Sequence, residues 1–112
     1  MKEEVRRAQK KQIEIMILEE LRLANLMYNK TFDNPMEALG VLQEEIFEAA
    51  QDWERLGFAY RNLQLYLCSG KLESSVTAAQ GIQCEVVHMI QELIQVGAMC
   101  QKFMGSRKGW YR

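Results

Sequence analysis

The sequence predicts an all-α protein, and three observations support this fold class. Apolar residues recur at alternating spacings of three and four along most of the 112-residue chain, which is the spacing of one helix face. The chain has a single proline, Pro35, and few clusters of β-branched residues. Hydrophobic residues make up 48% of the sequence, which is enough to bury a core at this length. We therefore expect one domain over residues 1–112, a bundle of about four helices.

The first helix is expected over residues 3–29. Its apolar side chains recur at helical spacing and cover two sides of the helix, which suggests contact with a second copy of the chain. The most regular positions in this stripe are Ile13, Ile17, Leu21, Ala24 and Tyr28.

The second helix has a strong start signal. Asn34 can cap it, Pro35 suits its first position, and Glu37 stands where a capping-box carboxylate belongs. We expect this helix to run to about residue 56, where Gly57 ends or bends it. Its apolar seam, with the Trp53 ring in the core, comprises Leu39, Leu42, Ile46, Ala49, Trp53 and Leu56.

Two further helices follow. Residues 58–68 predict a short third helix that ends at Ser69 and Gly70. The fourth and longest is expected from about residue 73 to residue 104. Within it, Gly81 and Gly97 either weaken the helix locally or let a neighbouring element approach closely. Gly105 is expected to end it, leaving residues 105–112 as a flexible tail.

Composition excludes several classes of function. A formal net charge of −1 argues against a nucleic-acid binder, which must neutralise many phosphates. No apolar run approaches the roughly 20 residues that span a bilayer. The three cysteines lack metal-binding spacing and indicate free thiols in a reducing compartment. The charged N-terminal segment does not resemble a signal peptide. We therefore expect a cytoplasmic protein that binds neither nucleic acid nor membrane.

The second and fourth helices each carry a polar stripe beside the apolar seam. The stripe of the second helix consists of Glu44, Glu45, Glu48 and Asp52, and that of the fourth consists of Glu85, His88, Glu92 and Gln95. Two such helices packed together would bring carboxylates face to face, and a divalent cation would remove their mutual repulsion. Oxygen ligands favour Mg²⁺, with Mn²⁺ as the alternative. A glutamate-rich stripe is also typical of a solvated helix face, and the spacing alone leaves both interpretations open.

The segment around these acids resembles the MazG-like nucleotide pyrophosphohydrolases. Their first signature, E-E-x-x-E on a helix, is present as Glu44, Glu45 and Glu48. Their second, E-x-x-D, has its closest counterpart in Glu92 and Gln95, followed by a run of small and apolar residues. The resemblance covers the second helix and the last third of the fourth, but not residues 57–84. It implies Mg²⁺-dependent cleavage of a nucleoside triphosphate to a nucleoside monophosphate and pyrophosphate.

The resemblance also implies roles for individual residues. Glu45, Glu48, Glu92 and Gln95 would bind the metal, and Glu44 and Glu48 would act in catalysis, with Glu44 positioning a water or a second ion. Gln95 stands where the family has aspartate, and its neutral amide removes one negative charge from the site. A chain that has lost catalysis and serves as an oligomerisation or regulatory module is therefore the alternative function.

A competing register takes Glu85 and His88 as the second motif, and its imidazole would suit zinc or manganese better than magnesium. We favour Glu92 and Gln95, because the residues after them fit the family better. His88, Glu85 and Lys30 then become contacts to the substrate. Because the family often completes its pockets across subunits, we expect a homodimer or homotetramer.

Overall fold

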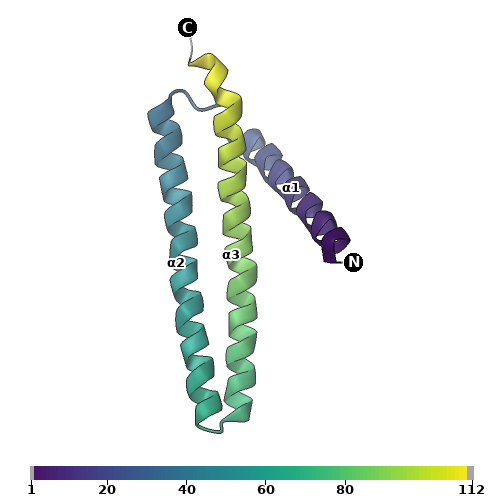
Figure 1. The fold of residues 1–112 in the computed structure, drawn as a ribbon. Helices are drawn as coiled ribbons and strands as arrows, with labels where there is room; N and C mark the ends of the chain where they lie inside the picture. The colour runs from purple at the N-terminus through teal and green to yellow at the C-terminus, as the bar shows by residue number, and fades with distance from the viewer. Residues whose placement is uncertain (1, 111–112) are drawn as a thin grey trace. The chain divides into compact units, whose positions relative to one another are not determined.

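The computed structural model describes residues 2–110, and it is all-α, as the sequence predicts. Three long helices follow one another: α1 (Lys2–Met27), α2 (Pro35–Cys68) and α3 (Leu72–Ser106) (Figure 1). A single 3₁₀ turn, Arg107–Gly109, continues from the end of α3. No strand occurs among the described residues.

The structure differs from the expected four helices because α2 does not end at Gly57. The second and third predicted helices are one continuous element of 34 residues. A glycine inside a helix costs about 1 kcal/mol relative to alanine. Ending the helix there would instead leave up to four backbone carbonyls without intrahelical partners. The helix therefore continues through Gly57 and ends at Cys68.

The predicted cap at the start of α2 is present. The Asn34 Oδ1 atom accepts a hydrogen bond from the backbone N–H of Glu37 at 2.9 Å. The Glu37 carboxylate in turn accepts one from the backbone N–H of Asp33 at 3.0 Å. These reciprocal bonds satisfy donors that a helix N-terminus leaves unpaired.

The turn between α2 and α3 also lies where the sequence places it. Gly70 has a φ of 71°, a left-handed conformation that glycine adopts without a steric penalty. The backbone N–H of Lys71 donates to the carbonyl of Tyr66 at 2.9 Å, and that of Ser69 donates to the carbonyl of Leu65 at 3.0 Å. This turn reverses the chain, so that the adjoining parts of α2 and α3 run antiparallel (Figure 1).

The contacts of the chain separate into two compact units. Unit 1 comprises residues 1–45 and 93–112, and unit 2 comprises residues 46–92. In unit 1, α1 packs closely against α3, because a Cβ atom placed on Gly97 would lie 2.7 Å from Cδ1 of Ile17. The predicted close approach is therefore confirmed at Gly97, whereas a Cβ on Gly81 would meet nothing within 4 Å among residues 2–110.

Residues that follow the predicted end of α3 also make contacts in unit 1. The helix continues through Gly105 to Ser106, whose hydroxyl accepts a hydrogen bond from the backbone N–H of Phe32 at 2.8 Å. The indole N–H of Trp110 donates to the carbonyl of Phe32 at 3.1 Å, and its ring lies 5.4 Å from that of Phe103. The predicted tail thus begins as helix, and Tyr111 and Arg112 lie outside the described residues.

Few apolar side chains are buried in the single chain. The buried hydrophobic residues among those described are Phe32, Ala38, Ala49 and Ala98. Much of the predicted apolar seam is exposed, and the prediction that Trp53 lies in the core is wrong, since its exposed fraction is 66%. Within residues 2–110, no helix has both the length and the apolar character that crossing a bilayer requires.

Candidate metal centre

Unit 2 brings together polar side chains from the two predicted stripes. Its part of α2 carries Glu48 and Asp52, one helical turn apart, and its part of α3 carries Glu85, His88 and Glu92. Positions three and four apart lie on the same face of a helix. The antiparallel arrangement therefore sets the two rows opposite each other, as the sequence predicts.

Glu48 and Glu92 form the first pair across the hairpin. Their carboxylate oxygens lie within 4.8 Å of each other. The Glu92 side chain is 16% exposed, and burial raises its pKa above the ordinary value. The neighbouring Glu48 raises this pKa further, through repulsion and through a hydrogen bond that the two carboxyl groups can form only by sharing a proton. This pair therefore disfavours two full negative charges in the absence of a cation.

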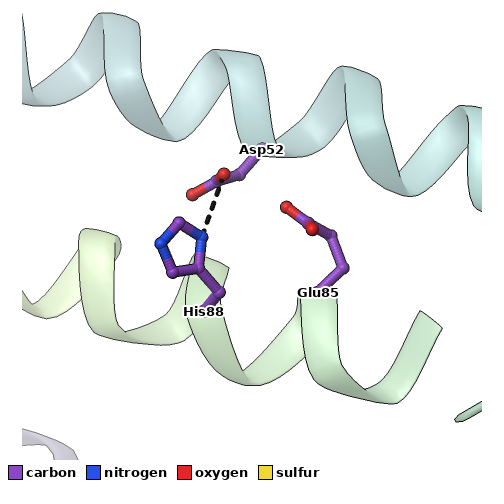
Figure 2. A group of neighbouring side chains, drawn as sticks. All are labelled: Asp52, Glu85 and His88. Atoms are coloured by element: carbon purple, nitrogen blue, oxygen red, sulfur yellow. Dashed lines mark hydrogen bonds and ion pairs between the residues drawn. The ribbon is translucent and has the colours of Figure 1, made fainter. Parts of the chain in front are cut away.

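Asp52 and His88 form the second contact across the hairpin. The Asp52 side chain is 1% exposed, and its Oδ1 atom lies 3.1 Å from Nδ1 of His88 (Figure 2). The same oxygen accepts a hydrogen bond from Nη1 of Arg55 at 2.9 Å. Glu85 extends from the preceding turn of α3, and its carboxylate completes a group of ligand atoms that all lie within 4.8 Å of one another.

His88 links the two pairs. Its Nε2 atom lies 3.7 Å from Oε1 of Glu92, while its Nδ1 atom is on the Asp52 side. A protonated His88 would lower the pKa of Glu92, but burial and Glu48 outweigh this effect. The imidazole thus stands between carboxylates from both helices.

Unit 1 holds the remaining predicted ligands. Glu44, Glu45 and Gln95 line a cavity of about 580 Å³, to which Lys102 also contributes. Glu45 lies one helical turn before Glu48 on α2 and is half-buried, whereas Glu44 is exposed. Lys30 is exposed in the segment between α1 and α2 and is not among the residues that line this cavity.

The residues of both registers that the sequence leaves open lie beside carboxylates of α2. Glu92 lies beside Glu48, and Glu85 and His88 lie beside Asp52. The sequence motifs give Asp52 no role beyond its place in the stripe. Its spacing from Glu48 was the available signal, but the partner across the hairpin depends on where the turn falls.

The unit 2 residues have the chemistry of a cation site. Three of their carboxylate oxygens are buried without a hydrogen-bond donor among the described residues: Oδ2 of Asp52, Oε1 of Glu85 and Oε2 of Glu92. Burying a negatively charged oxygen without a partner costs free energy. A divalent cation is the partner that could serve several of them at once.

No known family model matches the chain, and neither do curated proteins or solved structures. The fold and the site define an all-α protein in which two antiparallel helices carry rows of carboxylates that face each other. The likeness to the MazG-like enzymes rests on the motifs around Glu48 and Glu92.

Proposed function

We propose that this chain is a Mg²⁺-dependent nucleoside triphosphate pyrophosphohydrolase, in which Mn²⁺ can replace Mg²⁺. The observation that carries the proposal is the position of Glu92 beside Glu48, each from one of the two motifs. The raised pKa of Glu92 supports it, because perturbed pKa values are common at functional sites. Glu45, one turn before Glu48, and Gln95 are the further ligands that the motifs suggest.

The proposed reaction adds water across the anhydride between the α and β phosphates. The water oxygen forms a bond to phosphorus, the bond from phosphorus to the bridging oxygen breaks, and pyrophosphate leaves. Glu44 would accept the proton of the attacking water. The metal ion, when bound, neutralises phosphate charge and lowers the pKa of bound water. Glu48 and Glu92 would hold that ion through carboxylate oxygens.

Gln95 favours a second candidate function. Its amide is neutral, so a site that includes Gln95 attracts a cation less strongly than one with aspartate. The exposed apolar seam of this chain also suits assembly with other copies. A chain with this site and this surface could serve as an oligomerisation or regulatory module without catalysis. We propose a homodimer or homotetramer under either function.

Pyrophosphate release from a panel of ribo- and deoxyribonucleoside triphosphates tests the proposal. The full chain is assayed with Mg²⁺, with Mn²⁺ and with EDTA. We expect metal-dependent release of one pyrophosphate per nucleotide, and loss of at least about 100-fold in Glu48→Gln. Glu54→Gln is the matched control, because it removes the same charge from an exposed position of α2.

Two outcomes would contradict the enzyme. Absence of pyrophosphate release from every nucleotide with either ion would favour the non-catalytic module. Equal activity in Glu48→Gln and in the Glu54→Gln control would place the activity elsewhere.

A further inference from the structure

Asp52, Glu85 and His88 form a cluster in unit 2 to which the proposed hydrolysis assigns no metal-binding role. Asp52 comes from α2, while Glu85 and His88 stand three residues apart on α3 and so share one face of it. Figure 2 shows the three side chains reaching into the same space between the helices. One ligand atom from each lies within 4.8 Å of the others.

Burial separates this cluster from an ordinary solvated group of acids. Asp52 is the largest side chain among the described residues with less than 2% of its surface exposed. In the part of the chain that the structure describes, its Oδ2 atom has no hydrogen-bond partner, and neither has the buried Oε1 atom of Glu85. A buried carboxylate oxygen without a partner is unfavourable unless a positive charge lies nearby, and this cluster has one on each of two helices.

The positively charged side chains nearby do not supply that charge. Arg55 and His88 both interact with Oδ1 of Asp52, at 2.9 Å and 3.1 Å. The Arg55 side chain is 60% exposed, and no ion pair joins it to Glu85 within residues 2–110. Within residues 2–110, ion pairing therefore accounts for Oδ1 of Asp52 and leaves its Oδ2 atom and the Oε1 atom of Glu85 without a partner.

The donor set indicates which class of ion would bind. One imidazole nitrogen with two carboxylates suits first-row transition ions, whereas Mg²⁺ prefers oxygen ligands. The surroundings of His88 agree, because histidine ligands usually donate their second ring N–H to a carboxylate. With Nδ1 directed at the cluster, Nε2 faces Oε1 of Glu92 at 3.7 Å.

We propose that Asp52, Glu85 and His88 bind a divalent transition ion, with Zn²⁺ as the expected occupant. When the ion binds, Nδ1 of His88 is a ligand and carries no proton. The ring proton then lies on Nε2, towards Glu92, and a second proton, if the ring was charged, is released to water. Water fills the remaining positions around the ion. This site adjoins the proposed Mg²⁺ site, because Nε2 of His88 lies 3.7 Å from Oε1 of Glu92, but it shares no ligand with that site. The ion binds whether or not a nucleotide is hydrolysed.

Cobalt, which can replace zinc and is visible spectroscopically, tests the site in the full chain without nucleotide. The exposed thiols Cys68, Cys84 and Cys100 could also bind such ions. The background protein therefore carries serine at all three positions. His88 is the only histidine in the chain, so any hyperfine-shifted imidazole N–H resonance in the cobalt complex comes from this residue.

We expect one equivalent of Co²⁺ to bind saturably, to give one shifted imidazole N–H resonance, and to be displaced by Zn²⁺ but not by excess Mg²⁺. His88→Gln should weaken binding by at least about tenfold, and Asp52→Asn should weaken it similarly. Glu54→Gln is the charge-matched control and should bind like the background protein. Because Asp52 is buried, His88→Gln at a half-exposed position keeps the test decisive if Asp52→Asn does not fold.

Two results would overturn the proposal. One is cobalt binding that His88→Gln leaves unchanged. The other is binding that occurs only in the chain with its cysteines and shows a sulfur-to-cobalt charge-transfer band. Pyrophosphate release is not part of this measurement, so failure of the proposed hydrolysis leaves its result intact.

Discussion

The carboxyl group of Glu92 on α3 lies beside that of Glu48 on α2, within 4.8 Å, and its pKa is raised by burial and by this neighbour. A group of this kind lowers the stability of the folded chain when no cation is bound. The same arrangement should therefore be visible in stability measurements as well as in activity.

The first prediction concerns pH. In the unfolded chain the pKa of a glutamate is about 4.3, and in the folded chain that of Glu92 is higher. The folded state thus binds this proton more tightly. Its contribution to stability is fully present below the unfolded value and is lost as the pH rises through the folded value. Thermal unfolding of the metal-free chain in EDTA should show this decline.

Glu92→Gln should remove that decline, because glutamine has nearly the same shape and no charge. At about pH 7.5 in EDTA, we expect its Tm to exceed that of the parent chain by about 2–5 °C. Near pH 4 the two proteins should unfold at about the same temperature. Glu54→Gln serves as the control and should follow the parent at both pH values. A Tm for Glu92→Gln below that of the parent near pH 7.5 would falsify this account of the pair.

The second prediction concerns Mg²⁺ itself. A ligand that binds only the folded state adds about 2.7 kcal/mol of stability at 100 times its Kd, which corresponds to roughly 10 °C in Tm for a chain of this size. Differential scanning fluorimetry should show this increase for the parent and for Glu54→Gln. Glu48→Gln and Glu92→Gln should show little or none, and an equal increase in all four proteins would place the ion outside the pair.

The third prediction concerns two glycines that lie within helices. A Cβ atom on Gly57 would meet nothing within 4 Å, so Gly57→Ala should stabilise the chain by about 0.5–1 kcal/mol. A Cβ atom on Gly97 would lie 2.7 Å from Cδ1 and 3.0 Å from Cγ1 of Ile17. Because the Ile17 side chain must shift to admit this methyl group, Gly97→Ala should be less favourable than Gly57→Ala by about 1 kcal/mol or more.

A double-mutant cycle separates the clash from helix propensity. Shortening Ile17 to alanine removes both contacting atoms. In that background, Gly97→Ala should therefore change the free energy of unfolding more favourably than in the parent chain. Denaturant unfolding of the four proteins measures the coupling. If Gly97→Ala changed the free energy of unfolding equally in both backgrounds, α1 would not pack against Gly97.

The sequence predicted those parts of the fold that depend on short-range chemistry. The Asn34 cap and the turn at Gly70 each need only a few adjacent residues, and both are present. The prediction that Gly57 ends the helix is wrong. The free-energy cost of a glycine inside a helix is smaller than the cost of the backbone hydrogen bonds that would be lost if the helix ended there. Trp53 was placed in the core because its spacing fits the seam, but periodicity cannot show how much of a seam one chain can cover.

The candidate site could also be predicted only in part. The polar stripes follow from the rotation of each helix, so Glu48 and Glu92 could be placed beside their seams from sequence alone. The partner of each residue depends on the register of the hairpin, which the length of α2 and the position of the turn determine. For this reason the pairing of Asp52 with His88, 36 residues later in the chain, was not predicted.

The fourth prediction concerns Gln95, which stands where the resemblance expects aspartate. Gln95→Asp adds a negative charge and a better oxygen ligand, so it should lower the Kd for Mg²⁺ by about 3–10-fold and increase pyrophosphate release. Gln95→Asn is the control, because it shortens the side chain equally and keeps the amide. Isothermal titration with Mg²⁺ decides between them: equal affinities in both variants would remove Gln95 from the proposed ligand set.

The fifth prediction concerns the apolar surface of unit 2. Trp53, Tyr60 and Val86 are exposed and line a hollow of about 420 Å³ together with Leu56, Gly57 and Ile82. Exposed apolar patches of this kind commonly mark interfaces, so we expect the chain to form a dimer or tetramer in light-scattering measurements. Trp53→Lys should shift it towards monomer, because burying an unpaired ammonium at the interface is unfavourable. Gln51→Lys makes the same change in charge at an exposed position two residues away, on another face of α2, and should leave the mass unchanged. A parent chain that is monomeric at micromolar concentration would show that the hollow is not an interface between copies.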